Sequence, residues 1–401
     1  MAKPIRAAFG QIDLPINTAK PRLMHIDMNS CFASIEQQAN PLLRDRPIVV
    51  SPYTSPRGII VAPSVEAKAL GIKLGMRNQE AKEICPNLVI LPPDPDKYRD
   101  AHRRFKEILL SYTDQVYPRS IDEAIVDFRG TLDSRKLLDI GAEIKKRIYE
   151  EIGVAIRVSV GIGPNRWLAK LAAGLTKPDG LEQIDEHNLE DVYSRVELTD
   201  LPGINVRYEA RLKANGIHTP LELMNTPMIT LKKRVFGSVN GYYWHLRMRG
   251  WEIDDIEWQR KSIGHSYALK KKTEDTESLE RILIKLCEKA GRRLRRNDLF
   301  SQGISLSLGF RHRWWRKNQK TSNRLYTTNS IFEQAKNLLA QRPEGLVINM
   351  SVTLYSFQPL KPIQFSLFNS SIQEEEALSK SLDNINDKYG EFVVSPALMM
   401  D

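Results

Sequence analysis

The stretch YPRSIDEAIVDF, residues 117–128, alternates apolar and polar side chains and therefore predicts a β-strand with one buried face. Its apolar positions include Ile125 and Phe128, yet Asp122 and Glu123 stand side by side in its middle. Neighbouring residues of a regular strand point to opposite faces, so both acids can reach one site only at a strand end or a local distortion. Two carboxylates brought together raise each other's pKa unless a cation lies between them, which suggests a metal site.

A third acid, Asp27, follows an apolar strand in MHIDMNSCF, residues 24–32. If both strands deliver their acids to one edge of a sheet, the carboxylates can hold two Mg²⁺ ions, because this hard cation prefers oxygen ligands. Metals about 3.5–4 Å apart stabilise both the attacking and the leaving oxygen of a phosphoryl transfer. The alternative is that the acids are capping residues or surface ion-pair partners, and the acids alone leave both interpretations open.

The composition indicates a soluble globular protein: of 401 residues, 41% are hydrophobic and 27% are charged. The sequence contains no apolar run long enough for a membrane-spanning helix, and its N-terminus lacks the apolar centre of a signal peptide. Cys31, Cys85 and Cys287 are too few and too scattered for a disulfide framework or a zinc site. We therefore expect a cytoplasmic protein that does not associate with membranes.

The positive charge of the chain is concentrated in one segment. The whole chain carries a net charge of +10, whereas residues 260–361 hold 21 Lys and Arg residues against 8 Asp and Glu residues. This segment therefore carries +13, and the rest of the chain is slightly acidic. Such a distribution indicates a polyanionic partner, with an accidentally basic solvated face as the alternative.

Strands and helices alternate over residues 22–185, which predicts an α/β or α+β core. Residues 186–257 change to short helices, and LPGINVRYEARLKANGI, residues 201–217, resembles a helix-hairpin-helix. In that motif the hairpin offers backbone N–H groups to a phosphate. Asn205 takes the place of the usual second glycine, since asparagine tolerates left-handed geometry. A plain helical turn is the alternative, and this stretch alone leaves both open.

Residues 260–361 combine an amphipathic helix, ESLERILIKLCEKAGRRLRR (277–296), with alternating strands at GISLSLGF (303–310) and LVINMSVTLYSF (346–357). This pattern predicts a sheet with one apolar face on helices and one open face of small polar residues. RHRWWRKNQK (311–320) predicts a loop tip that grips a nucleic-acid backbone, or else a solvated hairpin.

Five motifs in order, DMNSCFASIE, SIDEA, VGIGPNRWLAKLAAGLTKPDG, LPGIN and KSIG, resemble those of Y-family translesion DNA polymerases. The resemblance covers roughly residues 22–368 and implies an α+β multidomain, right-hand polymerase fold. It implies an N-terminal extension (1–21), a ferredoxin-like palm (22–34 and 96–185), small fingers (35–95), a helix-hairpin-helix thumb (186–258), an α/β little finger (259–361) and a C-terminal tail (362–401).

The resemblance also implies error-prone, template-directed synthesis past damaged bases, as in the bacterial SOS response, with transfer from dNTPs to a primer 3′-OH through two Mg²⁺ ions or substituting Mn²⁺. By this resemblance, the catalytic metal ligands would be Asp27, Asp122 and Glu123, together with the Met28 carbonyl. Phe32 would be the steric gate and would contact the nucleotide with its neighbour Cys31, while Lys68 and Lys177 would bind the triphosphate. The residues that would contact primer–template DNA are Gly203, Asn205, Lys261, Arg311, Arg313 and Arg316.

Several positions depart from the usual family pattern. Asn29 replaces the commoner second acid, Val65 stands where many members have a tyrosine, Ala62 where threonine is frequent, and Lys68 where many have an arginine. Asn29 and the Val-Glu-Ala-Lys pattern are more similar to the catalytic subunit of bacterial DNA polymerase V than to the polymerase IV branch. Accessory subunits are therefore candidate partners.

The C-terminal tail contains a further recognition motif, PIQFSLFN, residues 362–369. It resembles the peptide that binds the bacterial sliding clamp, in which Gln364, Leu367 and Phe368 would be the anchors. Residues from 370 onward predict one acidic helix or partial disorder. We expect the protein to act at the nucleoid with primer–template DNA, dNTPs and the clamp.

Two other functions fit parts of the sequence. A catalytically inactive family member could act as a scaffold between DNA and clamp, but such a protein would have no need for Asp27, Asp122 and Glu123 together. A nucleotide cyclase also uses paired acids on a palm-like fold, yet it would have no use for the thumb hairpin, the basic segment or the clamp peptide.

Overall fold

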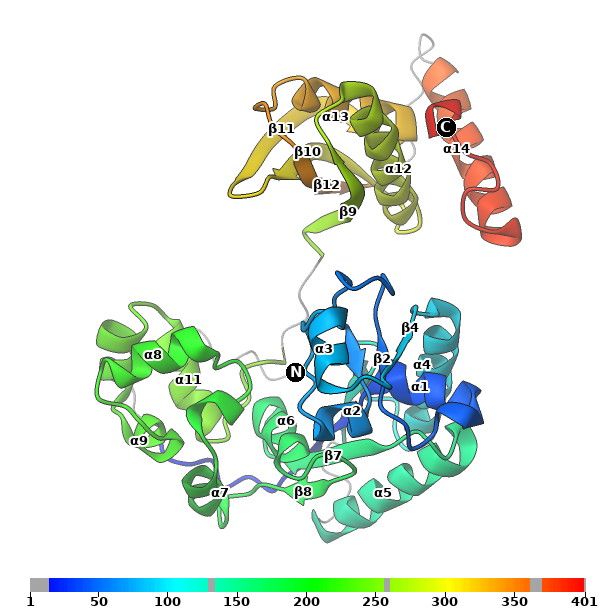
Figure 1. Ribbon diagram of the computed structural model, residues 1–401. Coiled ribbons are helices and arrows are strands. Elements are labelled where there is room, and N and C mark those ends of the chain that lie inside the picture. The colour runs from blue at the N-terminus through cyan, green and yellow to red at the C-terminus, as the bar shows by residue number, and fades with distance from the viewer. Residues whose placement is uncertain (1–13, 129–133, 256–259, 361–369, 400–401) are drawn as a thin grey trace. The chain divides into compact units, whose positions relative to one another are not determined.

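The computed structural model describes residues 14–128, 134–255, 260–360 and 370–399, and the chain forms two compact units, residues 1–256 and residues 257–401 (Figure 1). Both units combine helices with β-sheets, which confirms the predicted α+β multidomain class. None of the helices in the described part of the chain is long and apolar enough to cross a membrane.

A five-stranded sheet forms the centre of the first unit. Its strands run in the order β5 (Val116–Pro118), β6 (Glu123–Asp127), β1 (Leu23–Met28), β7 (Val158–Gly163) and β8 (Leu181–Gln183). All neighbouring pairs are antiparallel except β7 and β8. One face carries buried residues such as Ile26 and Val160, which pack against α4 (Pro95–Leu110) and α5 (Ser134–Arg147), the latter continued by a π-helical turn (Ile148–Ile152).

The other face of this sheet carries α6 (Arg166–Leu175), which Asn165 caps by accepting a hydrogen bond from the Leu168 amide. The helix lies very close to β7 because Gly161 has no side chain: a Cβ atom there would be 2.1 Å from the carbonyl oxygen of Ala169. This close approach brings residues of α6 next to the ends of β1 and β6.

The stretch 117–128 is not one strand, as its alternation predicts, but the two strands β5 and β6 of a tight hairpin. The amides of Arg119 and Ser120 both donate to the Glu123 carbonyl across the turn. The turn contains no glycine or asparagine that would signal it in the sequence. The alternation of apolar and polar residues also continues through the turn, so it does not reveal that the chain reverses direction. Pro118 ends β5 at the edge of the sheet, where a missing N–H donor costs least.

A small three-stranded sheet follows β1 and α1 (Cys31–Ala39) in the chain, with strand order β3 (Ala62–Pro63), β2 (Ile48–Val50), β4 (Val89–Leu91). Two short helices, α2 (Val65–Ala69) and α3 (Asn78–Ile84), lie between β3 and β4 in the chain.

Short helices make up the rest of the first unit, as the sequence predicts. They are α7 (Leu189–Arg195), a 3₁₀ turn (Leu198–Asp200), α8 (Val206–Lys213), α9 (Pro220–Asn225), α10 (Met228–Thr230), a π-helical turn (Leu231–Val235) and α11 (Asn240–Met248). The described end of the N-terminal extension packs beside α11, where Asn17 bonds the carbonyls of Arg249 and Gly250, and Trp251 donates to Pro15.

The second unit is an antiparallel sheet in the order β11 (Trp314–Leu325), β10 (Leu299–Gly309), β12 (Val347–Pro359), β9 (Ser262–Thr273), with helices α12 (Thr276–Arg295) and α13 (Thr328–Leu339). Ile304, Leu306 and Leu308 are fully buried against these helices, as their alternation predicts. The stretch 311–320 is mainly the edge strand β11 rather than a loop tip, since only residues 311–313 form the turn.

The acidic tail beyond residue 370 forms one helix, α14 (Ser370–Tyr389). It docks on α12 through the buried ion pair of Asp383 with Arg295, whose Nε lies 2.6 Å from a carboxylate oxygen. Asp387 pairs with Arg292 at 2.6 Å and also contacts Arg296. Charge complementarity between a basic and an acidic helix therefore holds the tail in place.

Candidate active site

Three acids meet at one end of the five-stranded sheet. Asp27, near the end of β1, lies directly opposite Glu123, the first residue of β6. Asp122 belongs to the hairpin turn just outside the strand, and its carbonyl accepts a hydrogen bond of 2.8 Å from the Met28 amide. Because Asp122 lies outside the regular strand, the opposite-face rule does not separate it from Glu123, and the two adjacent acids can serve one site.

Basic side chains surround these acids. Lys177 Nζ lies 2.9 Å from Oδ2 of Asp27, and Lys170 Nζ lies 2.7 Å from Oε2 of Glu123. The buried ring of His25 contacts the same Glu123 oxygen at 3.3 Å. The contact with His25, followed by that with Lys170, lowers the pKa of Glu123 to about 2, so this carboxylate is anionic at every working pH.

The acids form a fitting set of metal ligands. One ligand atom each of His25, Asp27 and Glu123 lies within 4.8 Å of the others; Asp122 is not part of this group, but it lines the same pocket as Asp27. His25 and Lys170 are absent from the residues singled out by sequence reasoning. The position of His25, two residues before Asp27 on the same strand and hence on the same face, is the signal that could have identified it.

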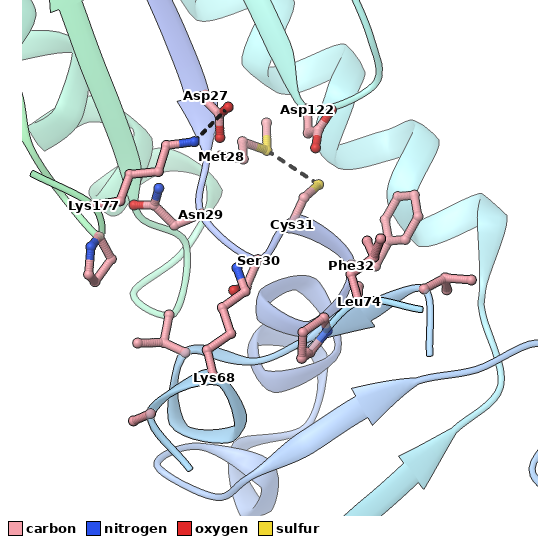
Figure 2. Close-up of a pocket in the computed structure, with 16 residues that line it drawn as sticks. Asp27, Met28, Asn29, Ser30, Cys31, Phe32, Lys68, Leu74, Asp122 and Lys177 are labelled. Atoms are coloured by element: carbon pink, nitrogen blue, oxygen red, sulfur yellow. Dashed lines mark hydrogen bonds and ion pairs between the residues drawn. The ribbon is translucent and has the colours of Figure 1, made fainter. Parts of the chain in front are cut away.

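A pocket of about 560 Å³ opens beside the acids and is lined by Asp27, Asp122, Phe32, Lys68 and Lys177. Glu123 is outside this lining, held by its basic neighbours. Figure 2 shows Lys177 and Phe32 on opposite sides of the pocket, with Lys68 extending into it from α2. The volume suits a small-molecule ligand of nucleotide size.

The walls of the pocket differ in chemistry. The Phe32 ring stacks on Tyr98, with ring centroids 4.3 Å apart, and gives one side an apolar surface. Burial, together with the charges of Asp122 and Asp27, raises the pKa of the Cys31 thiol, so this cysteine stays protonated. Burial and the nearby Lys177 lower the pKa of Lys68 below the usual lysine value.

Asn29 organises the segment that carries Lys177. Its side-chain oxygen accepts a 2.7 Å hydrogen bond from the Asp179 amide, and its nitrogen lies 3.0 Å from the Ser159 hydroxyl. An amide can accept one bond and donate the other, which a carboxylate cannot do. Asn29, which stands where the family commonly has an acid, therefore uses both the donor and the acceptor of its side-chain amide.

Comparison with known proteins identifies the family. Residues 26–174 match the impB/mucB/samB family, and residues 260–367 match the C-terminal domain of the same family. The chain is 35% identical to DNA polymerase IV of Moorella thermoacetica over 384 residues, which cover 93% of this chain and 95% of the relative. It is 31% identical to DNA polymerase IV 1 of Bacillus subtilis over 381 residues, 92% of this chain and 90% of the relative.

The chain belongs to the Y family of DNA polymerases. It is a DNA-directed DNA polymerase, and the resemblance drawn from its five motifs is confirmed. These relatives are of the polymerase IV type.

Solved structures show the same fold. The polymerase matches a Y-family DNA polymerase chimera, Dbh-Dpo4(243-245)-Dbh, with a TM-score of 0.75 and 24% identity over 84% of this chain and 99% of the chimera. An insertion ternary complex of Dbh DNA polymerase matches with a TM-score of 0.58 and 23% identity. The four-stranded sheet of the second unit is the little finger of this fold.

The hairpin at residues 201–205 differs from the expectation in one residue. Gly203 has a φ of +94°, as a tight hairpin requires, but Asn205 has a φ of −106° and is not left-handed. Asn205 instead caps α8, because its side chain accepts hydrogen bonds from the amides of Arg207 and Tyr208. These two N–H groups therefore have partners within the protein.

The predicted DNA-contacting residues of the little finger are all exposed: Lys261, Arg311, Arg313 and Arg316. Arg316 lies on the face of the sheet that is not covered by α12 and α13, where its Nε donates to the Ser305 hydroxyl at 3.0 Å. Arg313 donates to the Glu344 carbonyl from the turn before β11. Gln364, Leu367 and Phe368 of the clamp motif lie outside the described residues.

Proposed function

We propose that this polymerase carries out error-prone translesion synthesis, joining dNTPs to a primer 3′-OH by two-metal nucleotidyl transfer with Asp27, Asp122 and Glu123 as side-chain ligands. The observation that carries the proposal is that two neighbouring strands and one turn bring these three acids to one end of the sheet, where Asp27 and Asp122 line a nucleotide-sized pocket. An inactive scaffold would have no need for this arrangement.

The oxygen-rich donor set suits Mg²⁺, with Mn²⁺ as a substitute, and the Met28 carbonyl would complete it. When bound, two such ions stabilise the charge on the attacking and leaving oxygens. The residues of this chain have separate roles: Lys68 and Lys177 hold the triphosphate, and Phe32, beside Cys31, contacts the sugar. The Lys177 ammonium pairs with the Asp27 carboxylate at 2.9 Å. A cation bound to Asp27 would take over this charge and free Lys177 to bind phosphate.

We assign the five-stranded sheet to the palm (22–34 and 96–185), residues 35–95 to the fingers, residues 186–258 to the thumb and residues 259–361 to the little finger. The division into compact units after residue 256 supports the boundary between thumb and little finger. Gly203 and the backbone of its hairpin, with Lys261, Arg311, Arg313 and Arg316, would contact DNA phosphates.

The C-terminal tail would recruit a bacterial sliding clamp through Gln364, Leu367 and Phe368. The proposal rests on the sequence motif and on its position directly after the last strand of the little finger, β12. We place the polymerase at the nucleoid, with accessory subunits as further candidate partners.

Replacing the acids tests the metal assignment. Asp122→Ala and Glu123→Ala should each abolish nucleotide incorporation and leave primer–template affinity nearly unchanged, because these side chains bind metal rather than DNA. Primer extension and fluorescence anisotropy measure the two properties. Glu150→Ala, which removes an exposed acid paired at 3.9 Å with Lys146, is the matched control and should extend normally. Near-normal extension by either site variant would contradict the two-metal assignment.

A further inference from the structure

Both basic neighbours of Glu123 contact the same oxygen of its carboxylate. His25 Nε2 lies 3.3 Å from Oε2, and Lys170 Nζ lies 2.7 Å from it. Among the described residues, neither of these groups is paired with Oε1. One oxygen of the carboxylate is therefore anchored, and the other is left to meet a ligand.

His25 is an unusual residue at its position. It is 1% exposed in the middle of β1, opposite Ile125 on β6 and Gly161 on β7. Neither ring nitrogen makes a hydrogen bond of normal geometry among the described residues, and the one polar neighbour of Nε2 is Oε2 of Glu123 at 3.3 Å. Burying an imidazole with an unsatisfied nitrogen is unfavourable, and an apolar side chain would avoid that cost. The polar contact that distinguishes histidine from such a residue here is the one to Glu123.

Lys170 reaches the same carboxylate from a different element. It lies on α6, which can approach the sheet because Gly161 leaves room for the helix backbone. Oε2 of Glu123 is therefore contacted from two elements: by the buried His25 on the sheet and by the half-exposed Lys170 on the helix.

We propose that His25 is a positioning residue that, with Lys170, anchors Oε2 of Glu123 and leaves Oε1 to face a bound metal ion. The inference rests on the proposed two-metal function. Hydrogen-bonded neighbours of a ligating carboxylate restrict its rotation, so that less orientational freedom is lost when the metal binds. Without the buried anchor, the Glu123 side chain could follow the flexible Lys170 away from the site.

The proposal requires a specific proton on the ring. An ionised carboxylate can only accept hydrogen bonds, so His25 must carry a proton on Nε2. Nitrogen-15 correlation spectra of the histidine-labelled wild-type protein report this proton directly, with the His25 signal assigned by its loss in His25→Gln. A bare Nε2 would overturn the proposal, and the proton itself is observed in the wild-type protein.

Binding of Mn²⁺, followed by electron paramagnetic resonance on a complex with a dideoxy-terminated primer and matched dNTP, tests the consequence. His25→Leu should weaken Mn²⁺ binding about 10- to 100-fold, the range found when outer partners of metal ligands are removed. His25→Gln restores a neutral N–H donor and should recover most of that loss. Lys146→Met, which removes the lysine of an exposed pair with Glu150, is the control and should bind Mn²⁺ as wild type does.

Mn²⁺ binding by these variants distinguishes the role of Glu123 as a metal ligand from the role of His25 in positioning it. Glu123→Gln removes the proposed ligand itself, so unchanged Mn²⁺ binding in that variant would refute the two-metal function. Weakened binding in Glu123→Gln with unchanged binding in a folded His25→Leu would refute only the positioning role. A loss in His25→Leu that His25→Gln does not recover would show that the histidine matters for packing rather than for its N–H donor, and would also overturn the proposal.

Discussion

Phe32 forms the apolar side of the proposed nucleotide pocket, with its ring stacked on Tyr98 at a centroid distance of 4.3 Å. A bulky ring beneath the sugar excludes a ribonucleotide by steric clash and by offering its 2′-hydroxyl no hydrogen-bond partner. We predict that Phe32→Ala leaves a folded polymerase whose preference for deoxynucleotides falls at least about tenfold, or roughly 1.4 kcal/mol. Catalytic efficiencies for matched dNTP and NTP pairs measure the ratio.

A packing role for Phe32 makes a different prediction from a gate. Tyr98→Phe keeps the stacked ring but removes the hydroxyl that donates to Glu36 at 2.8 Å. This control should lower stability and leave the sugar preference unchanged. If Phe32→Ala also lowers stability without changing the sugar preference, Phe32 is a core residue and not a gate.

We expect Lys68, a proposed triphosphate ligand, to give nucleotide binding a pH dependence. Burial, followed by repulsion from Lys177, lowers its pKa, so it loses its charge at a pH where an ordinary lysine is still protonated. We predict that kcat/KM for dNTP, which reports the free enzyme, falls on the alkaline side at a lower pH than a solvent-exposed lysine would give. In Lys68→Arg the guanidinium stays charged, and the decline should move to higher pH. Superimposable profiles would exclude Lys68 from triphosphate binding.

At the scale of elements, the docking of α14 on α12 depends on a buried ion pair. Arg295 is 3% exposed and makes two hydrogen bonds to Asp383, at 2.6 and 2.9 Å. Asp383→Ala leaves the guanidinium buried without its main counter-charge, which should cost about 3–5 kcal/mol of stability. Hydrogen exchange of α12 and urea unfolding measure the loss.

The matched control replaces both partners of this pair. In Arg295→Met/Asp383→Leu no charge is left buried, so apolar packing should recover most of the stability. A cost below about 1 kcal/mol for Asp383→Ala would mean that the pair behaves like an exposed salt bridge and does not hold the tail.

At the scale of the whole molecule, most of the net positive charge belongs to the second unit, whose 23 Lys and Arg residues against 16 Asp and Glu residues give +7 of the total +10. Each phosphate neutralised on duplex DNA contributes a slope of about −0.9 to log K against log salt. We predict a slope of several units for the whole chain and a much smaller one for residues 1–256, measured by fluorescence anisotropy over a salt series. An unchanged slope in the shorter protein would place the DNA grip in the first unit.

Local patterns were enough to predict many elements of this polymerase. The alternation of Ile304, Leu306 and Leu308 predicts a strand with one buried face, because which side of a strand a residue faces depends only on its place in the sequence. The five ordered motifs likewise predicted the family and pointed to Asp27, Asp122 and Glu123, whose role as metal ligands remains a proposal.

Contacts between distant segments could be read only from the tertiary structure. The hairpin inside residues 117–128 is hidden by an alternation that continues through its turn. Lys170 meets Glu123 from 47 residues away because Gly161 lets α6 approach β7, and Arg295 meets Asp383 across 88 residues. Periodicity is set by neighbours along the chain, whereas these contacts depend on strand register and on how closely two elements approach. The sequence by itself therefore determined the family and many of the elements, and the tertiary structure decided where residues 117–128 reverse and which side chains hold the acids.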